Sequence, residues 1–196
     1  MLFRSLICFD QPSRVYRLQY FPLPGTLARM HDEALALVTA RRSATPLHVR
    51  PFPGVGSGFA ARVSALAAPG VTLAEGGSIV AQYAATRVAI HAYLGSSWLE
   101  TMGWDVPTVC LHDPASYAFR PDAAPLLDAL RRVGILHDSA ASAAAHLASI
   151  DADPAAWWGS AEVQLARIAF CDRYADRKST RLNSSHVSES RMPSSA

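Results

Sequence analysis

Residues 88–114 read VAIHAYLGSSWLETMGWDVPTVCLHDP and hold a complete strand–helix–strand unit. The apolar run Val88–His91 is typical of a buried strand, and it leads into a turn that contains Gly95. Two serines then open a helix at Ser97–Met102, and a second apolar strand follows at Val106–Leu111. Because two strands joined by a crossover helix pair in parallel, this unit predicts two neighbouring parallel strands.

The same alternation continues on both sides of the unit. Further helices are predicted at Thr26–Arg42, Phe59–Leu66, Ser78–Ala85, Ala123–Val133, Ser139–Ile150 and Ala161–Tyr174, and further strands at Leu47–Phe52 and Val71–Leu73. Gly134 stands where a helix ends, and Ser139 and Ser160 stand where N-caps belong. The pattern predicts a single α/β domain in three layers, with a parallel sheet covered on both faces by helices.

Both ends of the chain resemble translated sequencing adapter. Residues 176–196 back-translate into consecutive codons of a short-read adapter, interrupted by three codons that would hold a sample index, Val187 to Glu189. Residues 1–5 fit the reverse complement of the beginning of that adapter. We therefore expect residues 6–175 to be a natural fragment bounded by the sequencing library, and residues 176–196 to be disordered.

Net charge gives no support for nucleic-acid binding. The whole chain has 18 Lys and Arg against 16 Asp and Glu, but residues 6–175 alone hold 13 basic and 14 acidic side chains. The sequence pI near 8.6 thus depends on the adapter-like ends. The remaining sequence has no basic stripe of the kind that binds a phosphate backbone, so nucleic acid is excluded as a partner.

The cysteines and the hydropathy indicate a reducing compartment. Cys8, Cys110 and Cys171 are too widely spaced for a zinc motif and too few for a disulfide framework. No apolar run approaches the roughly 18 residues that span a bilayer. We expect a cytoplasmic protein, or one peripheral at the inner face of the membrane, with no metal site and no cofactor.

The turn in the quoted stretch places hydrogen-bond donors near a carboxylate. Ser96 and Ser97 begin the helix, and Gly95 allows a ligand to approach the backbone closely. A helix N-terminus offers unpaired N–H groups and a positive dipole end, both of which favour phosphate. Glu100, one turn later, is placed to accept hydrogen bonds from ribose hydroxyls. A capping serine followed by a solvated glutamate explains the same residues equally well.

Three segments resemble bacterial transferases associated with surface-carbohydrate or spore-coat polysaccharide synthesis, a GT-B-like family. These segments are IHAYLGSSWLETMGWDVPT, FRPDAAPLLDALRRVGILHDSAASAAAHL and AAWWGSAEVQLARIAFCDRYA, within a similarity that covers roughly Leu47–Ala175. In GT-B glycosyltransferases, the C-terminal Rossmann-like domain binds the sugar nucleotide. The resemblance implies that Gly95, Ser96, Ser97 and Glu100 bind the nucleotide, although Leu94 stands where the family usually has a polar residue.

Three further residues are candidates for substrate binding. His91 ends a strand, Arg50 follows the apolar residues of another strand, and Arg120 precedes a helix. Each also has a structural explanation: a buried histidine, a surface arginine, and an arginine paired with Asp122.

Other motifs have simpler structural explanations. GVGSG at 54–58 lacks the lysine of a phosphate loop and reads as a flexible turn. Asp151 and Asp153 read as a helix end and a cap, and Trp157 and Trp158 read as core residues, since adjacent helical side chains diverge by about 100°.

These observations and the resemblance together predict the Rossmann-like, C-terminal half of a GT-B-type fold. We expect this half to bind a nucleotide-activated sugar donor, while a missing N-terminal domain supplies the catalytic base and contacts a glycan or lipid-linked acceptor. A nucleotide-sugar epimerase of the same architecture and a non-catalytic scaffold of a carbohydrate pathway remain alternatives, because fold alone does not define function.

Overall fold

A computed structural model describes residues 5–9, 24–43, 45–51, 58–74 and 76–175 of the chain. The predicted disordered tail at 176–196 and most of the predicted turn at 54–58 lie outside the described residues. Ser5, the last residue of the adapter-like head, is the first residue of a strand.

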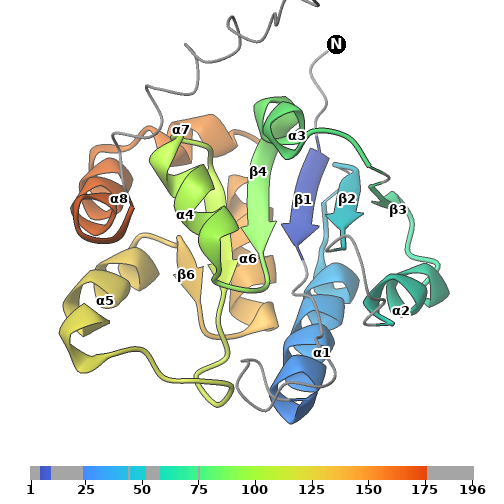
Figure 1. The fold of residues 1–196 in the computed structure, drawn as a ribbon. Helices are drawn as coiled ribbons and strands as arrows, with labels where there is room; N and C mark the ends of the chain where they lie inside the picture. The colour runs from blue at the N-terminus through green and yellow to red at the C-terminus, as the bar shows by residue number, and fades with distance from the viewer. Residues whose placement is uncertain (1–4, 10–23, 44, 52–57, 75, 176–196) are drawn as a thin grey trace, which may run out of the picture.

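Six parallel strands form one sheet at the centre of the domain (Figure 1). The strands are β1 (Ser5–Phe9), β2 (Leu47–Arg50), β3 (Val71–Leu73), β4 (Thr86–His91), β5 (Thr108–Leu111) and β6 (Leu136–His137). Their order across the sheet is β3-β2-β1-β4-β5-β6. This is the strand order of the dinucleotide-binding Rossmann fold, so the predicted parallel α/β architecture is confirmed.

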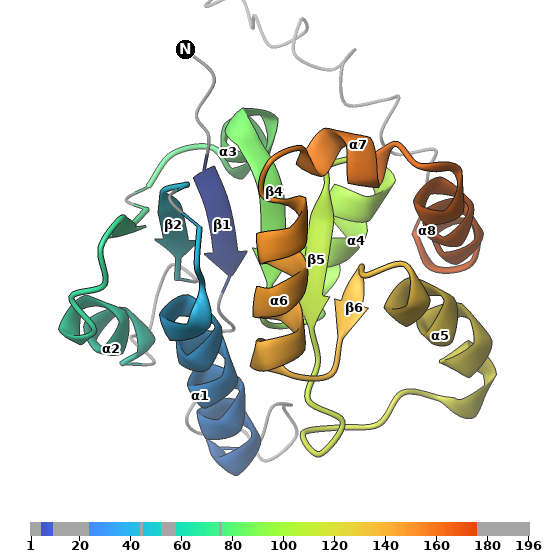
Figure 2. The same ribbon diagram turned by 180° about the vertical axis from the view of Figure 1, so that it is seen from behind.

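Helices cover both faces of the sheet (Figures 1 and 2). One face carries α1 (Pro24–Ala40), α2 (Phe59–Ala65) and α6 (Ala140–Ile150). The other carries α3 (Ile79–Ala85), α4 (Ser96–Gly103), the 3-10 turn η1 (Pro121–Ala123), α5 (Ala124–Arg132) and α8 (Ala161–Tyr174). The short α7 (Pro154–Trp158) lies at the end of the sheet where β4 begins.

Side chains of the central strands alternate between two apolar cores. Val88 and Ile90 of β4 pack with α1 and α6, as do the neighbouring residues of β5 that point the same way. Cys110 of β5 points to the opposite face and packs with α4, α5 and α8. The burial of both faces of these strands explains why they read as continuous apolar runs rather than as an alternating pattern.

The predicted elements agree with the structure within a few residues, with one correction and three omissions. Ser139 caps α6 by accepting a hydrogen bond from the Ser142 N–H, as predicted. Ser160 is the residue before α8, but its side chain makes no capping hydrogen bond, so this part of the prediction is wrong. β1, β6 and α7 were not predicted.

The two aspartates and two tryptophans that the sequence analysis interpreted as structural have structural contacts. Asp153 caps α7 through the Ala156 N–H, and the Asp151 carboxylate accepts a hydrogen bond from the Ser43 hydroxyl at 2.6 Å. Trp158 is a core residue, and the half-buried Trp157 donates its indole N–H to the Val133 carbonyl. Cys110 and Cys171 are both buried. None of the described helices is both long and apolar enough to cross a membrane.

Candidate functional site

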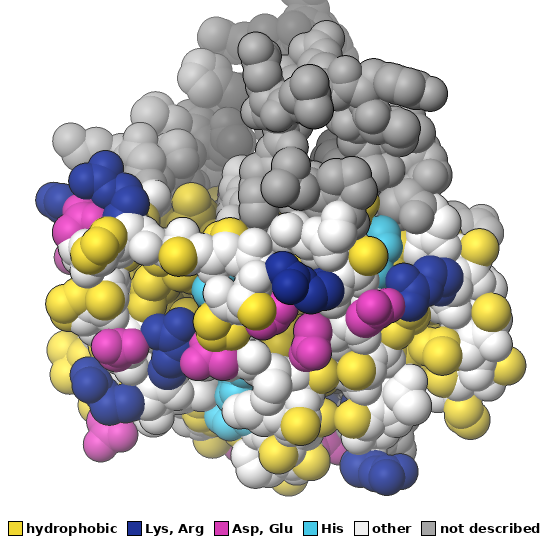
Figure 3. Space-filling view, turned by 90° about the horizontal axis from the view of Figure 1, so that it is seen from below, with side chains coloured by type: hydrophobic (Ala, Val, Ile, Leu, Met, Phe, Trp, Pro, Cys, Tyr) yellow, Lys and Arg dark blue, Asp and Glu magenta, His cyan; other side chains and the backbone are white. Residues whose placement is uncertain are grey.

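The centre of the sheet contains the point at which the strand order reverses. β1 pairs with β2 on one side and with β4 on the other, and Phe9 lies opposite both Arg50 and His91. The carboxyl ends of β2, β1 and β4 are therefore level with one another. In open parallel sheets, ligands bind outside the carboxyl ends of the strands at such a reversal. Figure 3 looks onto this edge and shows basic and acidic side chains interspersed across it.

The helix α4 starts at this edge, immediately after β4. Its N-cap is Gly95, and no side chain caps its first turn. Side chains of Ser78, Ser139 and Asp153 cap α3, α6 and α7, whereas α2, α5 and α8 have no side-chain cap, like α4. Within the described part of the chain, no side chain caps the first N–H groups of α4, as the phosphate-binding interpretation requires.

A buried hydrogen bond holds α4 against the sheet. The imidazole Nε2 of His91 lies 2.9 Å from the Thr101 hydroxyl oxygen, and the Thr101 hydroxyl itself donates to the Trp98 carbonyl. Since that hydroxyl has a single proton, His91 must donate to it through Nε2–H. His91 is fully buried, and burial lowers its pKa from the usual 6.5 to about 3, so the ring is neutral.

His91 therefore contacts α4 instead of facing solvent. Its Nδ1 lies 3.5 Å from the Ser97 hydroxyl, which orients that serine at the start of α4. This placement favours the structural role of His91 that the sequence left open, in which it positions the helix.

A second anchor joins the far end of α4 to α8. The buried Arg167 donates a 2.7 Å hydrogen bond to the Met102 carbonyl and lies 3.2 Å from the Asp105 carboxylate. Asp105 also accepts the indole N–H of Trp158 at 2.8 Å. His91 of β4 and Arg167 of α8 thus hold α4 from two sides through the neighbouring residues Thr101 and Met102.

Ser97 and Glu100 project from the side of α4 that faces β4 and α3. Among the described residues, no cation forms an ion pair with Glu100. Partial burial raises the pKa of its carboxyl group. The negative charge of Glu100 and the positive charge of Arg50 both act on the buried hydroxyl of Tyr83, which places these three side chains in one region.

Arg50 ends β2 beside the strand-order reversal. Its guanidinium donates to the Gly76 carbonyl at 2.9 Å and to the Gly77 carbonyl at 3.2 Å. These bonds hold the side chain over the β3–α3 connection. Since a guanidinium has five N–H groups, the two contacts leave donors for an anion.

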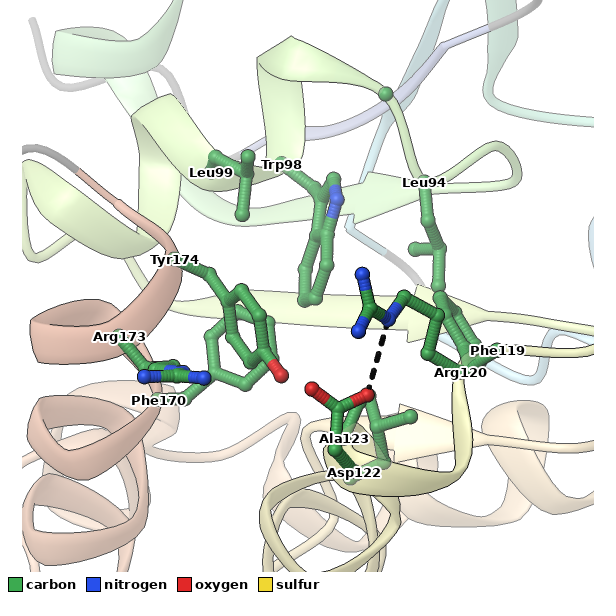
Figure 4. A pocket seen from close by; sticks show the side chains of 12 residues that line it. Leu94, Trp98, Leu99, Phe119, Arg120, Asp122, Ala123, Phe170, Arg173 and Tyr174 are labelled. Carbon is green, nitrogen blue, oxygen red and sulfur yellow. Dashed lines mark hydrogen bonds and ion pairs between the residues drawn. The ribbon is translucent and has the colours of Figure 1, made fainter.

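The opposite side of α4 borders a cavity of about 450 Å³ that we call the aromatic cavity (Figure 4). It lies between α4, the start of α5 and the end of α8. Its walls comprise Leu94, Gly95, Trp98, Leu99, Phe119, Arg120, Asp122, Ala123, Leu127, Phe170, Arg173 and Tyr174. Two of the predicted site residues, Gly95 and Arg120, thus meet at one cavity, whereas His91, Arg50 and Glu100 do not line it.

Arg120 forms the predicted ion pair with Asp122, at 3.1 Å, and it remains highly exposed at the cavity mouth. Its substrate-binding role stays a prediction. Sequence reasoning missed the aromatic walls of the cavity, because Trp98, Phe119, Phe170 and Tyr174 come from three distant segments.

The strand order and the covering helices define a Rossmann-like α/β domain, in which α4 begins next to the strand-order reversal. Comparison with family models identifies the family: residues 8–186 match the LIC12162 family transferase model, and the chain belongs to this transferase family. The matched range extends past Ala175 into the segment that we attribute to adapter, so the boundary at Ala175 stays a prediction. No curated protein and no solved structure matches the chain.

Proposed function

We propose that this domain binds the nucleotide part of an activated sugar, as the donor half of a GT-B-like glycosyltransferase of surface-polysaccharide synthesis. One observation carries the proposal: the N-terminus of α4, which no described side chain caps, lies at the carboxyl end of β4, next to the reversal of the strand order. In folds of this class, nucleotide phosphates bind to the N–H groups of a helix N-terminus at this position.

Each predicted residue then has a chemical role. The N–H groups of Ser96 and Ser97, together with their hydroxyls, would donate to the diphosphate, and Gly95 would let it approach the backbone. The Glu100 carboxylate would accept hydrogen bonds from ribose hydroxyls. Its lack of a described cationic partner supports this role, because a paired carboxylate would have to give up an ion pair to bind ribose.

Arg50 would contribute a positive charge from the neighbouring strand β2. It ends its strand level with His91, with β1 between them. Guanidinium groups bind phosphate oxygens through paired N–H donors. An anion at the strand-order reversal would therefore lie between the α4 N-terminus and Arg50.

The substitution Glu100→Gln tests the proposal. The change keeps the shape of the side chain but removes charge-assisted hydrogen bonds worth about 1.5–3 kcal/mol each. Affinity for a nucleoside diphosphate should fall by roughly 10- to 150-fold, at about 1.4 kcal/mol per factor of ten. Thermal stability should stay unchanged, because Glu100 is exposed and forms no described ion pair.

Calorimetric titration with a panel of nucleoside diphosphates measures the effect. Glu162→Gln, an exposed glutamate in the first turn of α8, is the matched control and should bind like the parent. Equal affinities of Glu100→Gln and the parent would remove Glu100 from the site, and a parent that binds none of the panel would refute the proposal. Binding without sugar transfer by the complete protein would favour the epimerase or scaffold alternative.

A further inference from the structure

The aromatic cavity is unused by the proposed nucleotide site, which lies on the other side of α4. We propose that it binds an amphipathic anion, a molecule with an aliphatic or isoprenoid chain and a phosphate or similar anionic head. Its volume of about 450 Å³ falls within the range of small-molecule sites, about 300–1,000 Å³. The inference does not rest on the proposed nucleotide binding, because only Gly95 borders both places.

The inner surface of the cavity is apolar. Its walls are formed by aromatic and aliphatic side chains, namely Leu94, Trp98, Leu99, Phe119, Leu127 and Phe170. Trp98 and Phe170 pack against each other with ring centroids 4.8 Å apart, and both are buried. The indole and phenyl rings thus form a fixed floor. A hydrocarbon chain on this floor gives up no hydrogen bonds to water, whereas the polar groups of a sugar or a nucleobase buried among these apolar side chains would need partners there.

The charged groups of the cavity stand at its mouth. Arg120 and Arg173 carry two positive charges, and Asp122 carries the one negative charge among the lining residues. Asp122 pairs with Arg120 at 3.1 Å, and among the described residues no carboxylate pairs with Arg173. In Figure 4 the Arg120 guanidinium points into the space between Trp98 and Asp122.

This distribution of charge selects the head group of the ligand. The net charge at the mouth is positive, so an anion is attracted and a cation is repelled. Guanidinium groups also bind phosphate and carboxylate in paired hydrogen bonds. An apolar floor with an excess of arginine at its rim therefore fits an anionic amphiphile better than a neutral or cationic one.

Calorimetric titration of the full chain with decyl phosphate, below its micelle concentration, tests the inference. Decyltrimethylammonium has the same chain with a cationic head, and inorganic phosphate has the head without the chain. We expect saturable binding of decyl phosphate alone. No binding of decyl phosphate, or equal binding of the cationic amphiphile, overturns the proposal.

Three variants locate the binding. Arg173→Gln should weaken decyl phosphate binding about tenfold or more, or about 1.4 kcal/mol, through loss of a charge-assisted contact. Leu99→Trp should abolish binding by filling the cavity. Arg132→Gln, an exposed arginine of α5 outside the cavity, should bind like the parent.

The variants also separate this site from the nucleotide site. Arg173→Gln should leave the affinity for nucleoside diphosphates unchanged, and Glu100→Gln should leave decyl phosphate binding unchanged. Retained binding in a folded Leu99→Trp protein, or equal losses in Arg173→Gln and Arg132→Gln, overturns the proposal. Because Arg173 is exposed, Arg173→Gln should fold like the parent, so it tests the proposal even where Leu99→Trp does not fold.

Discussion

Replacing Gly134 by alanine should destabilise the domain through two separable effects. Gly134 ends α5 with φ of 80°, and its N–H donates to the Arg131 carbonyl while the Ile135 N–H donates to the Leu130 carbonyl. This is the hydrogen-bond pattern of a Schellman motif, in which the left-handed residue is usually glycine. An alanine in that conformation costs about 1–2 kcal/mol.

The second effect is a steric conflict with His146. A Cβ atom on Gly134 would lie 2.4 Å from the His146 Cε1 atom and 2.7 Å from its Nε2 atom. The His146 ring has little room to move, because it packs between His137 and Trp157, with ring centroids 5.1 and 4.8 Å away. Overpacking of this kind costs about 1–3 kcal/mol.

A double-mutant cycle measures the two effects. Alanine also lowers the conformational entropy of the unfolded chain, which raises the free energy of unfolding by about 0.4–1 kcal/mol. Gly134→Ala should therefore lower the free energy of unfolding by about 2–4 kcal/mol in total. In a His146→Ala background only the backbone cost should remain, about 1 kcal/mol. The free energy of unfolding of all four proteins in urea gives the coupling, which we expect to be at least about 1 kcal/mol.

Two results would refute this reasoning. Additive effects, within about 0.3–0.5 kcal/mol, would mean that the His146 ring moves aside without cost. A stable Gly134→Ala variant would mean that the backbone at this position is not held in the left-handed region. An exposed position on the same helix, Asp128→Ala, serves as a control and should change stability by less than about 1 kcal/mol, because it loses only a surface ion pair.

Two further predictions concern stability. Arg167→Leu should cost about 2–4 kcal/mol in a thermal or urea melt, because it leaves the buried Met102 carbonyl with only the long 3.4 Å hydrogen bond from the Asp105 N–H. A loss no larger than that of the exposed Arg132→Leu would contradict the anchoring role. Burial lowers the pKa of His91 to about 3 and that of His146 to about 4, so both are neutral when folded, while the unfolded forms take up protons below about pH 6.5. Stability should therefore fall as the pH drops below about 6.5, by up to about 1.4 kcal/mol per pH unit for each histidine, and His146→Gln should reduce this slope between about pH 6.5 and 4. Urea midpoints at several pH values measure both effects, and an unchanged slope in His146→Gln would contradict the placement of that ring.

The sheet and most helices were predictable because their signals are local. Apolar periodicity identified the segments from Thr26 to Tyr174, and Gly134 marked the end of α5 as predicted. β6 has two residues and α7 has five, which are too short for periodicity to distinguish. β1 is recognised from its pairing with β2 and β4, and such long-range pairing leaves no signal in a five-residue run.

The residues of the candidate site were also predictable where their signal is local, whereas their orientation was not. Gly95, Ser96, Ser97 and Glu100 lie within six consecutive positions after one strand, so the sequence alone indicated them. Their precise orientation depends on contacts that no local pattern contains. Arg167 reaches the Met102 carbonyl across 65 positions of the chain, and its burial among apolar residues runs against the usual exposure of arginine.

The aromatic cavity is a product of packing between distant segments. Its walls come from residues 94–99, 119–127 and 170–174, and each segment alone reads as an ordinary amphipathic helix or loop. The packing of α8 against both α4 and α5 brings the three together. Since Arg167 holds α8 to α4, a variant that removes this anchor should alter the cavity as well as the stability. If a folded Arg167→Leu protein no longer binds decyl phosphate, the Arg167 anchor maintains the cavity. If its binding is unchanged, apolar packing alone maintains the cavity.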